Sequence, residues 1–250
     1  MPPRKRSDLA PDYLDALTRG QIASSTLVDV LAMDLAALVA HVVPEAACEL
    51  GPRLQADPAL GITRKMALIG QGLYAHLGLE RAVLLADSPS DTVRGWLCYV
   101  IAAAPDLSLA ERLARIRPLA DDPHFGVREW AWLALRPHLA AEIPVALSLL
   151  TAWTAESSPL LRRFASEATR PRGVWCAHLT VLRRDPTPGL ALLEPLRADP
   201  VRYVQDSVGN WLNDAAKDHP ALVRALTDRW RAESPVAATL AICKRGLRNL

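Results

Sequence analysis

The segment SEATRPRGVW and the residues just before it concentrate charged side chains at helical spacing. Arg163, Glu167 and Arg170 follow one another at i, i+4 and i+7, so a helix would place them on one face. Pro171 then ends that helix, which leaves Arg170 and Arg172 at a corner where guanidinium forks can hold phosphates. The pattern indicates a binding site, and a salt-bridged solvent face is the alternative.

Trp175 follows this corner, at the expected start of the next helix. A Trp beside clustered arginines and a carboxylate is often a core residue. If it borders a groove, its ring can pack on a sugar or a base, or hold a cation over its face.

A second polar group lies in the segment from Asp199 to Pro220, whose Asp-Pro opening and His-Pro end predict one helix. The apolar residues of one face are Val204, Val208, Trp211 and Ala215. The opposite face carries polar residues, namely Asp206, Asn210, Asn213, Asp214 and Lys217. Asn and Asp are poor helix formers, so their repeated use in mid-helix indicates a site.

Well-known catalytic and metal-binding motifs are not found. The sequence has no P-loop, GxGxxG, HExxH or GxSxG pattern. The four cysteines are single and widely spaced, which is typical of small core residues in a reducing cytosol and not of a disulfide frame or a zinc site. We therefore expect no metal and no cofactor.

Composition points to an ordered globular chain. Half of the 250 residues are hydrophobic, mean hydropathy is +0.09, and the net charge of +2 neither demands nor excludes nucleic acid. The longest apolar run contains Asp29 and Asp34, which is too polar for a membrane span. The first ten residues form a short basic arm without a secretion signal. We expect a cytoplasmic protein.

Strand patterns are almost absent, and Ala and Leu dominate, which predicts an all-α fold. The expected helices cover residues 8–19, 25–43, 45–55, 58–77, 79–87, 90–104, 108–119, 124–139, 142–154, 158–169, 173–184, 188–197, 201–217, 219–231 and 234–250.

Several of these helices repeat one pattern, an apolar anchor followed by a basic or amide residue and an apolar stripe. The anchors Val93, Val127, Leu161 and Val204 lie 34, 34 and 43 residues apart. Such spacing is typical of HEAT- or TPR-like helix pairs, and the Asp-Pro and Ser-Pro openings favour HEAT. We expect a single domain over 1–250, a right-handed α-α superhelix with a concave face. Residues 1–88 would form an N-terminal helical cap and 89–250 the repeats.

Matching positions of successive repeats should stack across the concave face. From the second anchor onward they carry carboxylates, arginines and amides, namely Glu129, Arg136, Arg163, Glu167, Arg170, Asp206, Asn210 and Asn213.

Longer segments resemble the HEAT-like repeat DNA alkylation-repair glycosylases of the AlkC/AlkD superfamily. They are VREWAWLALRP, LRRFASEATRPRGVW and YVQDSVGNWLNDAAKDHP. STLVDVLAMDLAALVAHVVPE, GITRKMALIGQGLY and ICKRGLRNL look closer to the AlkC branch. The resemblance implies a monofunctional glycosylase that removes cationic bases of the 3-methyladenine type from double-stranded DNA. It also implies that the concave face of the superhelix is a concave DNA-binding face, and that the protein is nucleoid-associated when bound to DNA. We expect a monomer with no membrane partner.

The resemblance also implies roles for individual residues. The catalytic set would be Glu167, Asp214, Trp175 and, as a third acidic member, Glu129. The DNA-binding set would be Arg163, Arg170, Arg172, Lys217, Arg136, Asn210 and Asn213, the two asparagines also orienting the carboxylates. The alternatives are a non-catalytic HEAT-like module that binds damaged or branched DNA, and a protein-interaction scaffold.

Overall fold

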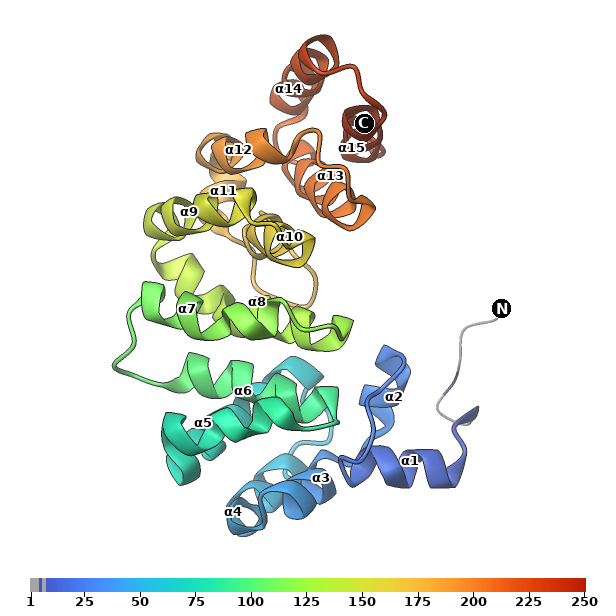
Figure 1. The fold of residues 1–250 in the computed structure, drawn as a ribbon, viewed down its shortest axis with the longest axis vertical. Coiled ribbons are helices and arrows are strands. Elements are labelled where there is room, and N and C mark those ends of the chain that lie inside the picture. Colours follow the sequence, from blue (N-terminus) through green and yellow to red (C-terminus); the bar gives the residue numbers. More distant parts are fainter. Residues whose placement is uncertain (1–4, 6–7) are drawn as a thin grey trace. The chain divides into compact units, whose positions relative to one another are not determined.

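The computed structural model describes residue 5 and residues 8–250, and every regular element formed by these residues is helical (Figure 1). The predicted all-α helical-repeat class is confirmed. The basic N-terminal arm lies largely outside the described residues. No helix in the described part of the chain is long and apolar enough to cross a membrane.

The chain divides into two compact units, Met1–Ala134 and Leu135–Leu250. The first contains α1 (Pro11–Thr18), α2 (Leu27–Ala32), α3 (Leu35–Val42), α4 (Pro44–Gln55), α5 (Ile62–Ala82), η2 (Val83–Asp87), α6 (Asp91–Ala103), α7 (Leu109–Ala120) and most of α8 (Phe125–Ala141). The second contains α9 (Ile143–Thr151), η3 (Ala152–Ala155), α10 (Pro159–Ala168), α11 (Thr180–Arg184), α12 (Thr187–Leu193), η4 (Glu194–Leu196), α13 (Arg202–Ala216), α14 (Pro220–Glu233) and α15 (Ala237–Gly246). The predicted cap over 1–88 and repeats over 89–250 stay a prediction.

The residue after each repeat anchor fastens the loop that leads into its helix. Arg94 donates to the carbonyl oxygen of Ser88, six residues earlier, at 2.7 Å. Arg128, Arg162 and Gln205 donate to the carbonyl six residues before them at 2.7, 2.8 and 2.8 Å. All four anchors are buried. Each repeat therefore pairs a core residue with a side chain that binds the preceding loop, which we call the clamp.

The first unit has two breaks in its helices, one within an expected helix and one at an expected boundary. The expected helix over 25–43 is interrupted at Met33, whose ψ is 144°. Asp34 then caps α3 by accepting from the backbone of Ala36 and Ala37 at 2.9 and 3.1 Å. The expected boundary between the helices over 58–77 and 79–87 is present, because α5, which begins at Ile62 and ends at Ala82, has non-helical backbone at Gly78, where φ is +63°.

The expected helix over 173–184 is also wrong in its first half. Helix α11 begins only at Thr180. Residues 169–179, which we call the Trp175 loop, form no helix. Gly173 and Trp175 both have positive φ, at 63° and 57°, a backbone conformation that no right-handed helix contains.

The apolar face predicted for α13 is confirmed. Val204, Val208, Trp211 and Ala215 are all buried, and α13 packs against α10, α14 and α15 (Figure 1). The cysteine prediction holds for Cys98 and Cys243, which are core residues, whereas Cys48 is exposed and Cys176 is half-buried.

Candidate functional site

Two carboxylates and an arginine meet where the end of α10 lies beside α13. Arg170 donates to Glu167 Oε1 through Nη1 at 2.7 Å. The same guanidinium approaches Asp214 Oδ2 with Nε at 3.0 Å and Nη2 at 2.9 Å. The segment containing Arg170 and the predicted helix containing Asp214 are thus brought together, 44 residues apart in sequence.

The cluster is almost completely buried. Glu167, Arg170 and Asp214 are 4%, 7% and 3% exposed. Burying a charge is costly unless it is paired and hydrogen-bonded, and these three groups satisfy one another. Ser207 on α13 donates to Glu167 Oε2 at 2.7 Å, so both carboxylate oxygens of Glu167 accept a hydrogen bond.

The surroundings of Glu167 and Arg170 favour the charged form of both groups. Burial by itself raises the pKa of Glu167, but the positive charges of Arg163 and Arg170 and the Ser207 hydrogen bond bring it below its ordinary value of 4.5. Burial likewise opposes the charge of Arg170, yet the negative charges of Glu167 and Asp214 raise its pKa above its ordinary value. A depressed pKa suits Glu167 to electrostatic stabilisation and not to proton donation.

Asp214 is the carboxylate with an oxygen left for a ligand. Its Oδ2 accepts from Arg170 and, at 3.3 Å, from the backbone N–H of Gly173. No hydrogen bond from the described residues reaches Oδ1, and the Lys217 ammonium lies 3.8 Å from it. An anionic oxygen beside an exposed lysine is able to accept a hydrogen bond from water or to face a cation.

Trp175 is exposed, which contradicts a core role, and its positive φ contradicts the predicted start of a helix. Its side chain is 59% exposed, and its φ of 57° is unusual for a residue with a large side chain. Such backbone strain costs on the order of 1–3 kcal/mol and is concentrated at functional sites. An aromatic ring held in this way on a loop next to the cluster is suited to stacking on a ligand.

The predicted DNA-binding arginines differ in accessibility. Arg163 is buried, 4.7 Å from the ring centre of Tyr203 and 3.6 Å from Glu167. Arg172 is partly exposed and pairs with Asp218 at 2.8 Å. Together with the exposed Lys217, Arg172 is therefore better placed for a phosphate than the buried arginines.

Arg136 is 2% exposed, and all three of its side-chain nitrogens donate to main-chain carbonyl oxygens. Asn210 and Asn213 do not orient the carboxylates as predicted. Asn210 accepts from Arg245 and Arg248 at 3.0 Å each, and Asn213 donates to the carbonyl of Gly246 at 3.3 Å. Helix α15 packs against α13, and the two asparagines therefore bind residues in and after α15.

Sequence reasoning missed Ser207 and the backbone N–H of Gly173. Ser207 precedes Asp214 by seven residues, so helical spacing already placed the two on one face. Gly173 had no such signal, because its contact depends on how the Trp175 loop folds back.

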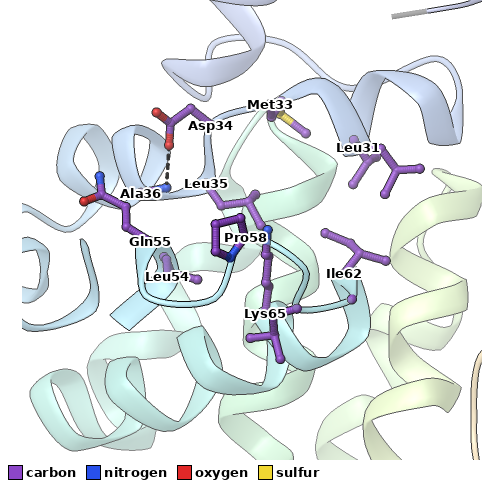
Figure 2. Close-up of a pocket in the computed structure, with 13 residues that line it drawn as sticks. Leu31, Met33, Asp34, Leu35, Ala36, Leu54, Gln55, Pro58, Ile62 and Lys65 are labelled. Atoms are coloured by element: carbon purple, nitrogen blue, oxygen red, sulfur yellow. Dashed lines mark hydrogen bonds between the residues drawn. The ribbon is translucent and has the colours of Figure 1, made fainter. Parts of the chain in front are cut away.

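Glu129 belongs to the first unit, where its carboxylate accepts from Trp132 Nε1 at 2.9 Å. Its predicted catalytic role stays a prediction. That unit also contains a cavity of about 350 Å³ between α2, α3, α4 and α5, with Asp34 and Lys65 as its charged lining residues (Figure 2). None of the predicted site residues lines this cavity.

Residues 122–243, which include both α10 and α13, match the family of DNA alkylation repair enzymes. The resemblance to the AlkC/AlkD superfamily is thereby confirmed. Among curated proteins, the chain is similar to the uncharacterized protein YhaZ of Bacillus subtilis, with 40% identity over 190 residues. The aligned part covers 73% of this chain and 51% of YhaZ, so the chain spans about half the length of that relative.

Two solved structures share the fold. One is the Pseudomonas fluorescens alkylpurine DNA glycosylase AlkC bound to DNA containing an abasic site analog. It matches with a TM-score of 0.67 and 28% identity, over 86% of this chain and 60% of AlkC. The other, smu.31 from Streptococcus mutans, matches with a TM-score of 0.59 and 21% identity over 87% of this chain and all of smu.31.

Proposed function

We propose that this protein is a DNA glycosylase that excises cationic alkylated purines, of the 3-methyladenine type, from double-stranded DNA. The observation that carries the proposal is the Asp214 carboxylate, which is held by Arg170 and Gly173 through one oxygen while the other accepts no hydrogen bond from the described residues. The similarity to AlkC, an alkylpurine DNA glycosylase solved with DNA, supports the same substrate class.

The chemistry requires little more than electrostatics. In a cationic alkylated purine the bond between C1′ and the base nitrogen breaks with both electrons passing to the base, which leaves as a neutral molecule. Positive charge then grows on the deoxyribose, and a carboxylate fixed beside it lowers the barrier. Because the leaving group is already activated, the step needs no metal and no cofactor.

In this mechanism the members of the cluster have different tasks. Asp214 Oδ1 faces the developing charge and orients the water that adds to C1′. The proton that this water loses passes to solvent. Glu167 adds negative electrostatic potential from its buried position, where both of its oxygens already accept hydrogen bonds. Arg170 fixes both carboxylates through its hydrogen bonds and favours the charged form of Glu167. Glu129 stays a candidate third acidic group.

Substrate binding would use the exposed groups. The Trp175 ring stacks on the cationic base or packs on the sugar, which is favourable because the ring face attracts positive charge. Lys217 and Arg172 hold phosphates and set the register of the duplex.

The test is release of free methylated bases from methylated duplex DNA. Asp214→Asn should lower the single-turnover rate by about 10²–10³-fold, because it removes one preorganised charge from the transition state. The matched control is Asp199→Asn, which removes a carboxylate that binds Arg162 at 2.6 Å in the same unit. Its rate per folded molecule should stay near that of the wild type.

Wild-type-like release by both Asp214→Asn and Glu167→Gln would refute the assignment of the carboxylates. Binding of methylated DNA by the wild type with no base release would instead support a non-catalytic DNA-binding module. Failure to bind DNA at low salt would favour a protein-interaction scaffold.

A further inference from the structure

We propose that Arg136 is a positioning residue that fixes the Trp175 loop, and not a phosphate contact. It lies in the part of α8 that belongs to the second unit. Its Nη1 donates to the carbonyl of Ala168 at 2.9 Å, Nη2 to that of Arg170 at 2.6 Å, and Nε to that of Ala177 at 3.1 Å. One guanidinium thus ties the last residue of α10 to both sides of the loop.

The guanidinium also fills the interior of the loop. A Cβ atom added to Gly173 would lie 2.5 Å from Cys176 Sγ and 3.1 Å from Arg136 Nη2, so the backbone of Gly173 closes directly over both groups. The loop is closed further by a hydrogen bond from Leu179 N–H to the Pro171 carbonyl at 2.9 Å. A strained residue such as Trp175 keeps its conformation only where its surroundings determine it, and Arg136 is the charged centre of those surroundings.

A direct contact between Arg136 and DNA is incompatible with this arrangement. The side chain is 2% exposed, and each of its nitrogens already has a carbonyl partner. A phosphate would have to displace these contacts and open the loop.

The consequence for function, which rests on the proposed glycosylase activity, concerns two neighbours of the cluster. The loop carries both the Trp175 ring and the Gly173 N–H that binds Asp214 Oδ2 at 3.3 Å. Loss of the brace would therefore displace the ring and one donor to the carboxylate. The exposed Lys217 lies outside the loop, whereas Arg172, the other proposed phosphate contact, lies within it, so DNA binding should weaken less than base release does.

The chain contains a matched control for such a brace. Arg112 in the first unit is also buried, and its guanidinium donates to the carbonyls of Ile101, Ala102 and Ala104. Arg112→Lys and Arg136→Lys both remove a guanidinium fork that binds three carbonyls while keeping the positive charge. Only the second change affects the Trp175 loop.

The first measurement is independent of catalysis. Trypsin cleavage at the Arg172–Gly173 bond, followed by mass spectrometry, should be about tenfold faster in Arg136→Lys than in the wild type or Arg112→Lys, since cleavage tracks the population of the opened loop. Equal cleavage in all three proteins would overturn the proposal. This result stands even if the wild type releases no methylated base.

The second measurement tests the catalytic consequence. Arg136→Lys should lower the single-turnover rate of base release about tenfold or more, because a misplacement of about 1 Å can cost up to 10²-fold. The dissociation constant for DNA should rise by a smaller factor than the rate falls, because Lys217 lies outside the loop. Guanidinium ion at millimolar concentration should restore part of the rate in Arg136→Ala, where that variant folds. An equal loss in Arg112→Lys, or a loss confined to DNA affinity, would contradict the positioning role.

Discussion

Helices α6 and α10 begin in the same way but carry different faces. In the first unit, Arg94 holds the loop before α6 and binds Asp122 through Nε at 2.8 Å. In the second unit, Arg162 holds the loop before α10 and binds Asp199 through Nε at 2.6 Å. The two clamps match atom for atom, so the repeat pattern in the sequence reports a framework that both units use.

The positions that follow the clamps have diverged. Six residues after the anchor, α6 has Tyr99 and α10 has Glu167. Nine residues after it, α6 has Ala102, whereas the second unit has Arg170, just beyond the end of α10. Tyr99 packs at 6.2 Å from the Trp130 ring as part of an apolar core, whereas Glu167 and Arg170 form the ionised cluster. The comparison teaches that the clamp serves folding, while the rest of the helix is free to carry a site.

The largest expected effect follows from removing the arginine that the two carboxylates of the cluster share. Arg170→Met should lower the free energy of unfolding by about 3–5 kcal/mol, because Glu167 and Asp214 would remain buried without their shared partner. Urea unfolding measures this change. Arg202→Met, which removes an exposed pair with Asp206, should cost only about 0–1 kcal/mol. Equal losses in the two variants would mean that burial does not distinguish the cluster.

The next largest expected effect is the loss of unfolding free energy at acidic pH. The pKa of Glu167 is lowered in the folded protein, so its stabilising contribution is fully present above its ordinary value of 4.5 and is lost as pH falls through the lower, folded value. Unfolding free energies measured between about pH 6 and pH 3 should therefore decline more steeply in the wild type than in Glu167→Gln. Parallel curves would show that Glu167 ionises as it does in the unfolded chain.

The smallest expected effect sharpens the assignment of the exposed groups. Lys217→Ala should weaken DNA binding and reduce the slope of log K against log salt by about one unit, the change expected for one lost phosphate contact. Lys65→Ala, which alters the cavity of the first unit shown in Figure 2, is the control and should leave the slope unchanged. An unchanged slope in Lys217→Ala would remove this residue from the DNA-binding set.

Local spacing was sufficient for much of the site. The i, i+4, i+7 series of Arg163, Glu167 and Arg170 predicted a shared face, and the ion pairs within that face are present. Asp206, which the spacing placed on the polar face of its helix, pairs with Arg202 and Arg245 at 2.8 and 3.1 Å. These predictions succeed because helical periodicity depends on the backbone alone.

Side-chain partners across helices were not predictable in this way. Asn213 sits on the polar stripe of α13, yet it is buried because the C-terminal segment covers it, with Asn249 donating to it at 3.1 Å. Whether a polar residue faces solvent, ligand or another helix depends on what packs over it, and no local pattern contains that information.

The sequence by itself determined the helical class, the repeat anchors and the two segments that carry the charged cluster, since these follow from composition and from periodicity within single helices. Only the tertiary structure decided that Asp214 keeps an open oxygen and that Arg136 is enclosed. It also decided that Trp175 projects from a strained loop. The physical reason is that burial and hydrogen bonding between segments are set by packing, which joins residues more than 30 positions apart.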